Sequence, residues 1–170
     1  MSIDYAHIVE GCKRRDRKAQ RQLYDGTVGM AMGICMRYAS CRSEAQDLLQ
    51  DGYVKVYERI GSLRQPERLL SWVYTVMVNT CIEATRRSSF ERLADDLEAH
   101  VQPFDFDPYT QHDVVAAMQQ LDPRQRLAFN LFAVEGYSVD EVARRMKLSG
   151  GNVRVILNRA RNKMKEYLTH

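Results

Sequence analysis

The 170-residue sequence has little of what marks a secreted, metal-binding or membrane-embedded protein. No apolar run approaches the roughly 20 residues that cross a bilayer, and no apolar segment follows a basic start as in a secretory signal. The cysteines lie far apart without a C-x-x-C pair, so neither a zinc site nor a disulfide framework is expected; they are Cys12, Cys35, Cys41 and Cys81. We therefore expect a cytoplasmic protein with reduced thiols, no metal, no cofactor and no membrane insertion.

Signals of catalysis are also scarce. No set of carboxylates has metal-ligand spacing, and the sequence has no Gly-rich phosphate loop. The histidines lie at the termini or near the middle of the chain: His7, His100, His112 and His170. We expect no catalytic residue, which argues against an enzyme such as a nuclease.

The formal net charge of +3 is small, but the charges are unevenly distributed. Residues 1–90 carry a net charge of +4, residues 91–113 carry −6, and residues 114–170 carry +5. The stretch from Arg144 to Lys165 has eight basic side chains and no acidic one. The chain thus has two basic blocks joined by an acidic strip. This distribution is a better guide to the kind of partner than the average charge is.

The acidic strip is the expected domain boundary. Its sequence AHVQPFDFDPYTQ has two prolines, no helical period and no long apolar run, as in an extended segment. Phe104, Phe106 and Tyr109 are unusual in a passive spacer, and two interpretations stay open. These rings either attach the linker to a neighbouring domain or contact a partner protein or nucleic acid. The expected segments are a domain over 1–90, a linker over 91–112 and a domain over 113–170.

Strand signals are almost absent while helix signals recur, so the predicted fold is all-α, with two small helical domains. In the first domain, a predicted capping box begins at Ser43, Gly61 is a stop signal, and Pro66 suits the first turn of a helix. Mixed three- and four-residue spacings predict one apolar face, made of Leu48, Leu49, Tyr53, Val56, Tyr57 and Ile60. The predicted helices cover 3–13, 16–38, 43–60 and 66–89.

The second domain is predicted to contain a helix-turn-helix. Asp122-Pro123 forms an N-cap followed by proline at the first helical position, and Gly136 is the predicted end of that helix. A second capping box opens at Ser138, and Ser149 caps the final helix. The predicted pair covers 138–147 and 149–167. Its packing residues are Val139, Val142, Ala143, Met146, Leu148, Val153, Leu157 and Ala160.

The second helix of this pair leaves polar and basic residues facing outward, as DNA recognition requires. A helix fits the major groove, and side chains near its N-terminus reach base edges. Phosphate contacts would add affinity without sequence information, from Arg144, Arg145, Lys147 and Lys163. The outward residues are Gly151, Asn152, Arg154, Val155, Asn158, Arg159 and Arg161.

The predicted helix over 66–89 carries two stripes. The residues expected to face the core are Leu70, Val73, Met77 and Ala84. A neighbouring face has aromatic, amide and cationic groups that suit a stacked, hydrogen-bonded single-stranded base: Trp72, Thr75, Asn79, Arg86 and Arg87. A tryptophan in a helix is more often a core residue than a binding one, so the residues alone leave both interpretations of Trp72 open.

Both blocks carry a resemblance to one family. AQDLLQDGYVKVYERIGSLRQPERLLSWVYTVMVNTCIEATRR resembles region 2 of the extracytoplasmic-function (ECF) sigma factors of bacterial RNA polymerase. LDPRQRLAFNLFAVEGYSVDEVARRMKLSGGNVRVILNRARNKMKEYL resembles their region 4. The resemblance covers about residues 5–168, in the family's order, and implies a promoter-specificity subunit. Its expected function is to bind core RNA polymerase, direct it to specific promoters and help melt the minus-ten element.

The resemblance also implies the role of particular residues. The D-L-x-Q-E/D pattern that binds core polymerase corresponds to Asp47, Leu48, Gln50 and Asp51. Binding of the minus-ten element, with capture of a flipped base by the loop over 62–67, is implied for Ser62, Arg64, Trp72, Asn79, Arg86 and Arg87. Binding of the minus-35 element is implied for Arg144, Lys147, Ser149, Asn152, Arg154, Asn158 and Arg159. The acidic linker is expected to follow the polymerase's RNA exit path.

The chain departs from the family pattern at several positions. Val155 and Ile156 replace a common Ser-Arg pair in the recognition helix, Asn158 stands at a His or Phe position, and Lys147 replaces the usual turn glycine. Leu70 replaces a common phenylalanine, which is expected to affect core packing. These departures put the base preference of relatives in doubt for this chain, while the groove-facing role stands.

The resemblance leaves the regulation open. Many relatives are held by an anti-sigma factor, so such a factor, or another regulatory protein, is an expected partner beside core polymerase and promoter DNA. An alternative from another class is a helix-turn-helix transcriptional regulator whose N-terminal domain dimerises or senses a signal. That alternative predicts specific duplex binding by the chain alone.

Overall fold

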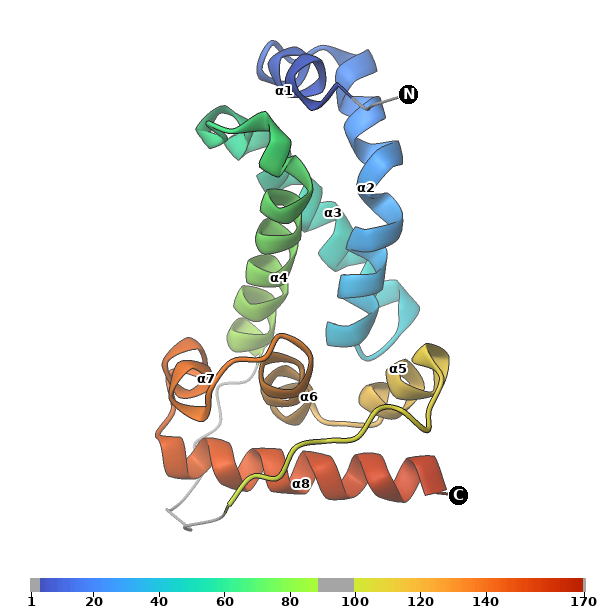
Figure 1. Cartoon of the computed structure of the whole chain (residues 1–170), viewed down its shortest axis with the longest axis vertical. Helices are drawn as coiled ribbons and strands as arrows, with labels where there is room; N and C mark the ends of the chain where they lie inside the picture. The colour runs from blue at the N-terminus through green and yellow to red at the C-terminus, as the bar shows by residue number, and fades with distance from the viewer. Residues whose placement is uncertain (1–3, 89–99, 170) are drawn as a thin grey trace. The chain divides into compact units, whose positions relative to one another are not determined.

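The computed structural model describes residues 4–88 and 100–169, which form helices and connecting segments without a strand (Figure 1). The all-α prediction is therefore confirmed. By its contacts the chain divides into two compact units: unit 1 comprises Met1–Cys35 and Ser43–Cys81, and unit 2 comprises Met36–Arg42 and Ile82–His170. Among the described residues, no helix is both long enough and apolar enough to cross a membrane.

Unit 1 is built from four helices and two short 3-10 segments, and each predicted helix is present. They are α1 (Tyr5–Lys13), α2 (Arg17–Tyr38), α3 (Arg42–Arg59), η1 (Ile60–Ser62), η2 (Pro66–Arg68) and α4 (Leu69–Ser88). The last residues of α2 and α4 belong to unit 2. Pro66 stands at the first position of η2, as its missing N–H favours.

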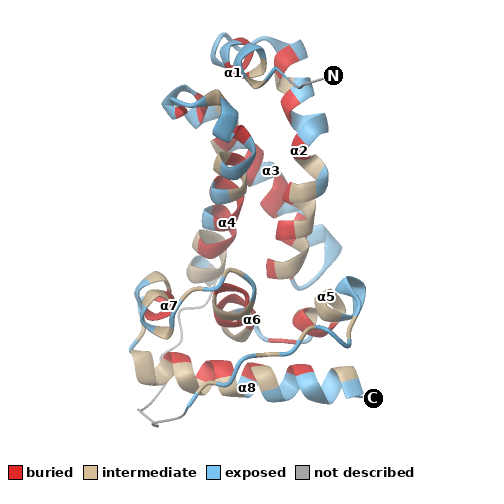
Figure 2. Cartoon of the chain, in the orientation of Figure 1, coloured by how far each residue is buried: buried red, intermediate tan, exposed pale blue. Residues whose placement is uncertain are grey.

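The core of unit 1 lies between the inward faces of α2, α3 and α4, where the ribbons are red in Figure 2. The apolar face predicted for α3 is confirmed, with Tyr57 only half-buried. Burial raises the pKa of the Tyr57 hydroxyl to about 12, and this hydroxyl donates to the Gln20 carbonyl at 2.9 Å. The hydroxyls of Tyr53 and Thr27 share a hydrogen bond of 2.7 Å, which satisfies both polar groups inside the core.

Two glycines in unit 1 lie where helices approach closely. A Cβ added at Gly52 of α3 would be 2.2 Å from Sδ of Met77 in α4. A Cβ added at Gly11 of α1 would be 2.4 Å from Cβ of Ala19 in α2. At Gly11 the neighbouring Cβ is fixed to the backbone, so the absence of a side chain sets the separation of α1 and α2. At Gly52 an added Cβ would force the buried Met77 side chain to shift.

Two predictions about unit 1 are wrong in detail. Helix α3 begins at Arg42, so Ser43 lies inside its first turn rather than at the N-cap. Leu70 is 40% exposed, and its neighbour Leu69, 1% exposed, takes the core position instead. The cause is the 3-10 segment before α4: the inward face begins at Leu69 and continues to Val73, so Leu70 is rotated by about 100° from it.

Unit 2 contains the helices α5 (Gln111–Gln119), α6 (Pro123–Phe129), α7 (Val139–Met146) and α8 (Gly150–Thr169), with one π-helical turn, η3 (Asn130–Val134). The predicted N-caps at Asp122 and Ser138 are confirmed, and Gly136 has the left-handed φ of 76° expected after a helix. Helix α5 and the π-helical turn were not predicted. The sequence signal for α5 is a capping box between Thr110 and Asp113.

Two of the linker rings, Phe104 and Phe106, pack on the core of unit 2, as the first interpretation of these rings predicts. The ring centroids of Phe104 and Phe129 are 5.2 Å apart in an edge-to-face arrangement, and Phe106 lies 4.9 Å from Phe104. Both rings contact a cluster of buried residues, made of Ala117, Met118, Leu121, Phe129, Ala160 and Met164. The intervening Asp105 is exposed, so this part of the linker alternates between rings facing in and carboxylates facing out.

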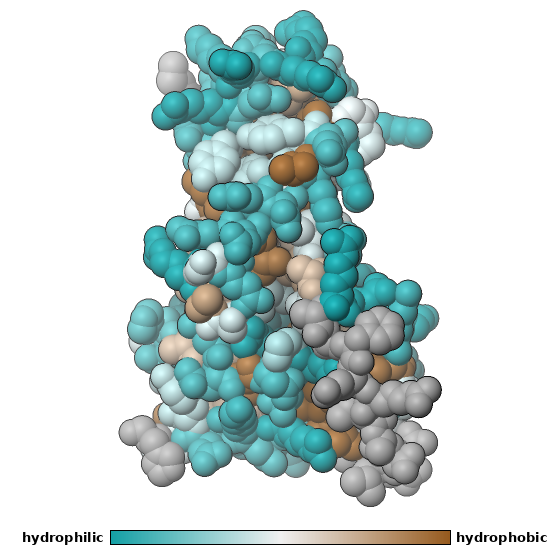
Figure 3. Space-filling model, turned by 180° about the vertical axis from the view of Figure 1, so that it is seen from behind, coloured by the Kyte–Doolittle hydropathy of each residue, from teal (hydrophilic) through white to brown (hydrophobic). Residues whose placement is uncertain are grey.

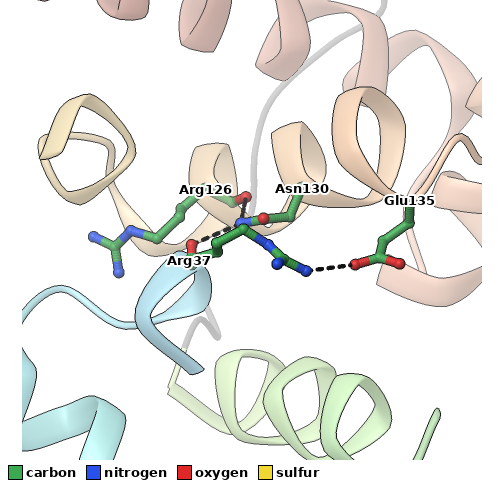
Figure 4. A network of polar contacts seen from close by, with 4 residues as sticks. All are labelled: Arg37, Arg126, Asn130 and Glu135. Atoms are coloured by element: carbon green, nitrogen blue, oxygen red, sulfur yellow. Dashed lines mark hydrogen bonds and ion pairs between the residues drawn. The ribbon is translucent and has the colours of Figure 1, made fainter. Parts of the chain in front are cut away.

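A polar network fixes the segment Met36–Arg42 within unit 2 (Figure 4). Arg126, 2% exposed, donates to the carbonyls of Leu121 at 2.7 Å and Tyr38 at 3.1 Å. The amide of Asn130 donates to the carbonyl of Arg37 at 2.7 Å. Buried donors need such partners, and Arg126 and Asn130 bind the backbone carbonyls of Tyr38 and Arg37 in this segment.

Candidate nucleic-acid and polymerase interfaces

Side-chain caps fix the starts of both α7 and α8. At the start of α7, the Ser138 hydroxyl accepts from the Glu141 N–H at 3.3 Å, and the Glu141 carboxylate accepts from the Ser138 N–H at 2.8 Å. The Ser138 N–H and the Ser138 hydroxyl both donate to the Glu141 carboxylate, and they lower its pKa. Helix α8 is capped by Ser149, whose hydroxyl accepts from the Asn152 N–H at 3.2 Å. Local hydrogen bonds therefore set where both helices begin.

Lys147 connects the two helices in a left-handed conformation, with φ of 56°. This is the position at which the resemblance led us to expect glycine. A side chain with a Cβ is strained in this region of backbone space, whereas glycine is not. Lys147 therefore places a positive charge in a turn whose backbone conformation favours glycine.

An apolar spine holds α7 against α8. The predicted packing residues are buried, except that Val139 and Leu148 are only half-buried. Ile156 is also buried, so this departure from the family pattern lies in the core and does not face the groove. Val155 is half-buried.

The predicted minus-35 residues all lie on the polar side of the α7–α8 pair. Asn152, Arg154 and Asn158 of α8 are half-buried. The exposed members are Arg144, Lys147, Ser149 and Arg159. Amide and guanidinium groups can form two hydrogen bonds to one base edge, so this face can contact both bases and phosphates.

Arg145 has a role that the sequence did not reveal. Its guanidinium lies over the ring of Tyr137, with Cζ 4.1 Å from the ring centroid. Cations over aromatic faces are attracted by the ring quadrupole. Arg145 therefore stabilises the turn between η3 and α7, in addition to contributing positive charge.

The second predicted stripe of α4 is accessible. Asn79 is exposed and Trp72 is half-buried, while Val73 and Met77 on another face are fully buried. Arg86 and Arg87 lie in the last turn of the same helix, and Arg87 forms an ion pair with Glu83. Trp72 is therefore half-buried and lies outside the core. Its ring is partly accessible, as stacking on an unpaired base requires.

Ser62 and Arg64 lie in the segment before α4. Both are exposed, and the Ser62 hydroxyl donates to the Arg59 carbonyl at 2.8 Å. This hydrogen bond closes the end of η1, while Arg64 is in the extended connection between η1 and η2. The loop is thus short and held at both ends.

Helix α3 presents three of its four predicted polymerase-binding residues. Asp47, Gln50 and Asp51 are exposed, but Leu48 is 6% exposed and packs in the core. Val54 lies on the same exposed face and is 56% exposed. Sequence reasoning left Val54 unassigned, although its absence from the predicted apolar face was a signal that it faces outward.

The described residues contain no group of three or more His, Cys, Asp or Glu side chains that could hold a metal ion. Cys12 is buried, and burial together with the nearby Asp16 raises the pKa of its thiol to about 11. A thiol with this pKa is protonated near neutral pH and is a poor nucleophile.

Comparisons with known proteins agree with this arrangement. Residues 23–91 match the family described as Sigma-70 region 2, and residues 111–164 match Sigma-70, region 4. RNA polymerase sigma factor CarQ of Myxococcus xanthus is 30% identical over 141 residues, covering 80% of this chain and 81% of CarQ. The ECF RNA polymerase sigma-E factor of Haemophilus influenzae is 26% identical over 170 residues, covering 91% and 89%.

A solved structure shows the same fold. It is the sigma factor RpoE in complex with the anti-sigma factor NepR from Bartonella quintana, with a TM-score of 0.51 and 21% identity over 88% of this chain and 96% of that chain. The order of the two matched regions and the relatives agree on the family. The chain belongs to the ECF subfamily of RNA polymerase sigma factors, and it is an alternative sigma factor that directs RNA polymerase to promoters.

Proposed function

We propose that this sigma factor binds core polymerase through α3 and holds promoter DNA with the loop before α4, α4 itself and the α7–α8 pair. The observation that supports this best is the division of the α7–α8 pair into a buried apolar spine and a polar face that carries every predicted minus-35 residue. A helix pair with this division can enter the major groove without exposing its core.

The exposed face of α3 is the proposed contact with core polymerase. Asp47, Gln50 and Asp51 place two carboxylates and an amide on one side of the helix, in a block whose net charge is positive. Exposed carboxylates on such a block fit a basic partner surface. Leu48 acts indirectly in this proposal, since its burial holds the helix in place.

The minus-ten element is the proposed ligand of the loop before α4 and of the exposed stripe of α4. Unpairing a base costs a few kcal/mol, which stacking and hydrogen bonding in a pocket offset. Trp72 supplies a partly accessible ring and Asn79 an exposed amide on one helix face. Ser62 and Arg64 would hold the captured base and its phosphate, and this binding would favour the melted promoter.

The remaining parts of the proposal concern the linker and the partners. The carboxylates of the linker would occupy the RNA exit path of the polymerase; residues 91–99 of it lie outside the described residues. We include an anti-sigma factor or another regulatory protein among the partners, as the Bartonella quintana protein is bound by one. The protein would act in the cytoplasm and contribute no catalytic residue.

Run-off transcription tests the function directly. Purified core polymerase with this chain, given genomic fragments as template, is expected to initiate at start sites that core polymerase alone does not use. The templates that start would also supply the promoter sequence. Specific duplex binding by the chain alone, with no new start site, would contradict the proposal and support a plain helix-turn-helix regulator.

Asp51→Lys tests the polymerase contact. We expect capture of core polymerase to weaken by at least about 100-fold, because placing like charges together at an interface costs several kcal/mol. Helical content should not change, since the side chain is exposed. Asp25→Lys is the matched control, because Asp25 is an exposed acidic residue on α2 of the same unit. Undiminished capture by the Asp51 variant would overturn the assignment of α3.

A further inference from the structure

The turn between α1 and α2 is strongly basic and has no role in the proposal above. Residues 13–18, KRRDRK, contain five basic side chains and one acidic side chain, and all six are exposed. Hydrophilic side chains also cover the part of unit 1 that bears α1 (Figure 3; α1 is at the top of Figure 1). We use the name basic turn for Arg15, Arg17 and Lys18.

The charges of the basic turn are not neutralised within the described residues. Lys13 pairs with Glu10 at 2.8 Å, and Arg21 pairs with Asp25 at 3.6 Å. Arg15, Arg17 and Lys18 form no ion pair with any residue that the structure describes. The carboxylate of Asp16 accepts from the backbone N–H of Lys18 at 2.8 Å. Like charges held together repel, so this surface favours an anionic partner.

The backbone holds the basic turn in one conformation. The N–H of Arg15 donates to the Cys12 carbonyl and the N–H of Asp16 donates to the Gly11 carbonyl, both at 3.0 Å. Arg15 has a left-handed φ of 60°. The close approach of Gly11 to Ala19 fixes α1 against α2 on either side of the turn. The backbone that carries the cations is therefore already ordered, so binding has to order only their side chains.

The position of the basic turn relates it to the proposed minus-ten site. Helix α1 packs against η1 and η2, which flank the loop with Ser62 and Arg64. Because α1 has nine residues, the turn at its end lies within about 13 Å of this contact, at about 1.5 Å per residue. Arg86 and Arg87 are at the opposite end of α4, about 30 Å along a 20-residue helix.

This order of sites defines a path for the strand. In the proposed function, the edge of the duplex is at Arg86-Arg87 and the captured base is at the loop before α4. A strand that continues past the captured base, away from the duplex, then arrives at α1 and its basic end. The acidic residues of α3 are proposed to contact a basic surface of the polymerase. The basic turn carries the opposite charge, and an anionic partner such as a DNA strand suits it.

We propose that Arg15, Arg17 and Lys18 bind the phosphate backbone of the melted strand, a few nucleotides beyond the captured base on the side away from the duplex. Guanidinium groups bind phosphate through two parallel hydrogen bonds, and an ammonium group binds it as a point charge. Contacts of this kind fix the path of the strand and carry no sequence information. This inference rests on the proposed function, because it assumes that the loop before α4 captures the flipped base.

The test compares the wild-type holoenzyme with the triple variant Arg15→Gln, Arg17→Gln, Lys18→Gln. The probe is a forked promoter DNA, with a sequence from the run-off experiment, whose single strand extends past the captured base. The slope of log affinity against log salt concentration should become shallower by about 2, at about 0.7 for each lost cation on a single strand. The matched control is Arg15→Lys, Arg17→Lys, Lys18→Arg, which keeps every charge and should keep the slope.

A second probe, whose single strand ends at the captured base, tests the placement. The triple Gln variant should bind this shorter probe as the wild type does, since the phosphates in question are absent. An unchanged salt slope on the longer probe, or an equal loss on both probes, would overturn the proposal. Loss of core-polymerase capture would assign the basic turn to the polymerase and would also overturn it. Failure of the wild-type holoenzyme to initiate would instead contradict the proposed function.

Discussion

Units 1 and 2 are both built from amphipathic helices, but different interactions fix their helices. In unit 2, side-chain caps fix the start of four successive helices, at Thr110, Asp122, Ser138 and Ser149. Unit 1 also has caps, but glycine allows close contacts between its helices, with Ala19 at Gly11 and with the Met77 side chain at Gly52. A cap is a local signal, whereas a glycine contact depends on a residue from another helix. Unit 1 should therefore be sensitive to one added methyl group, and unit 2 to polar changes at helix ends.

The largest expected effect is that of Gly11→Ala. The new Cβ would lie 2.4 Å from Cβ of Ala19, and neither atom can move without a backbone shift. Overpacking typically costs about 1–3 kcal/mol, and we expect the upper end, measured by urea unfolding. Gly29→Ala is the matched control, because its added Cβ meets nothing within 4 Å. That variant should gain up to about 1 kcal/mol from helix propensity, and equal stability of the two variants would refute the close crossing.

Phe104→Ala is expected to have the next largest effect, and it acts on unit 2. The ring contacts Phe129 edge to face at 5.2 Å. Truncating a fully buried Phe costs about 3–5 kcal/mol, so about 2 kcal/mol is expected for this half-buried ring, again by urea unfolding. Asp107→Ala is the control from the exposed side of the same segment, with an expected change within about 0.5 kcal/mol. Similar losses for both variants would show that the ring contacts do not hold the segment.

Ser138→Ala tests the importance of caps in unit 2. Loss of this N-cap should cost about 1 kcal/mol at neutral pH. The pKa of Glu141 is lowered below its ordinary 4.5 by the Ser138 N–H, which the variant keeps, and by the Ser138 hydroxyl, which it loses. The contribution of the hydroxyl is therefore present above that pH and is lost as the pH falls through the lowered value. The stability difference between wild type and variant should therefore shrink in acid. A difference that stays constant down to pH 3 would show that the carboxylate does not take part.

The comparison also explains what the sequence could predict. The caps at Asp122, Ser138 and Ser149 depend on residues within three positions, so they are visible in a single sequence. Leu70 and Leu69 could not be told apart, because the phase of α4 depends on the 3-10 segment before it. Arg126 was overlooked, since charged residues are rarely buried and its carbonyl partners come partly from residue 38.

For the candidate interfaces too, the sequence could predict local helical spacing but not tertiary contacts. Helical spacing placed Asn79 of α4 and Arg159 of α8 on outward faces, and both are exposed, whereas Asn152, Arg154 and Asn158 of α8 are half-buried. Leu48 was assigned to the polymerase contact from the family pattern alone, and its burial shows that a motif can include residues that support the helix. The basic turn escaped notice in the sequence because the net charge of its block averaged it with the acidic residues of α3. Its relation to the loop before α4 is a tertiary contact of α1.

Lys147→Gly has the smallest expected effect and separates stability from binding. Relief of the left-handed strain at φ 56° should raise the stability of unit 2 by about 0.5–1 kcal/mol, after the entropic cost of glycine. Loss of the cation should make the salt slope for minus-35 duplex binding shallower by about 0.9. Lys147→Ala is the matched control, because it removes the same charge but keeps a Cβ in the strained turn. It should show the shallower slope without the gain in stability, and an equal gain for both variants would show that the turn stores no strain.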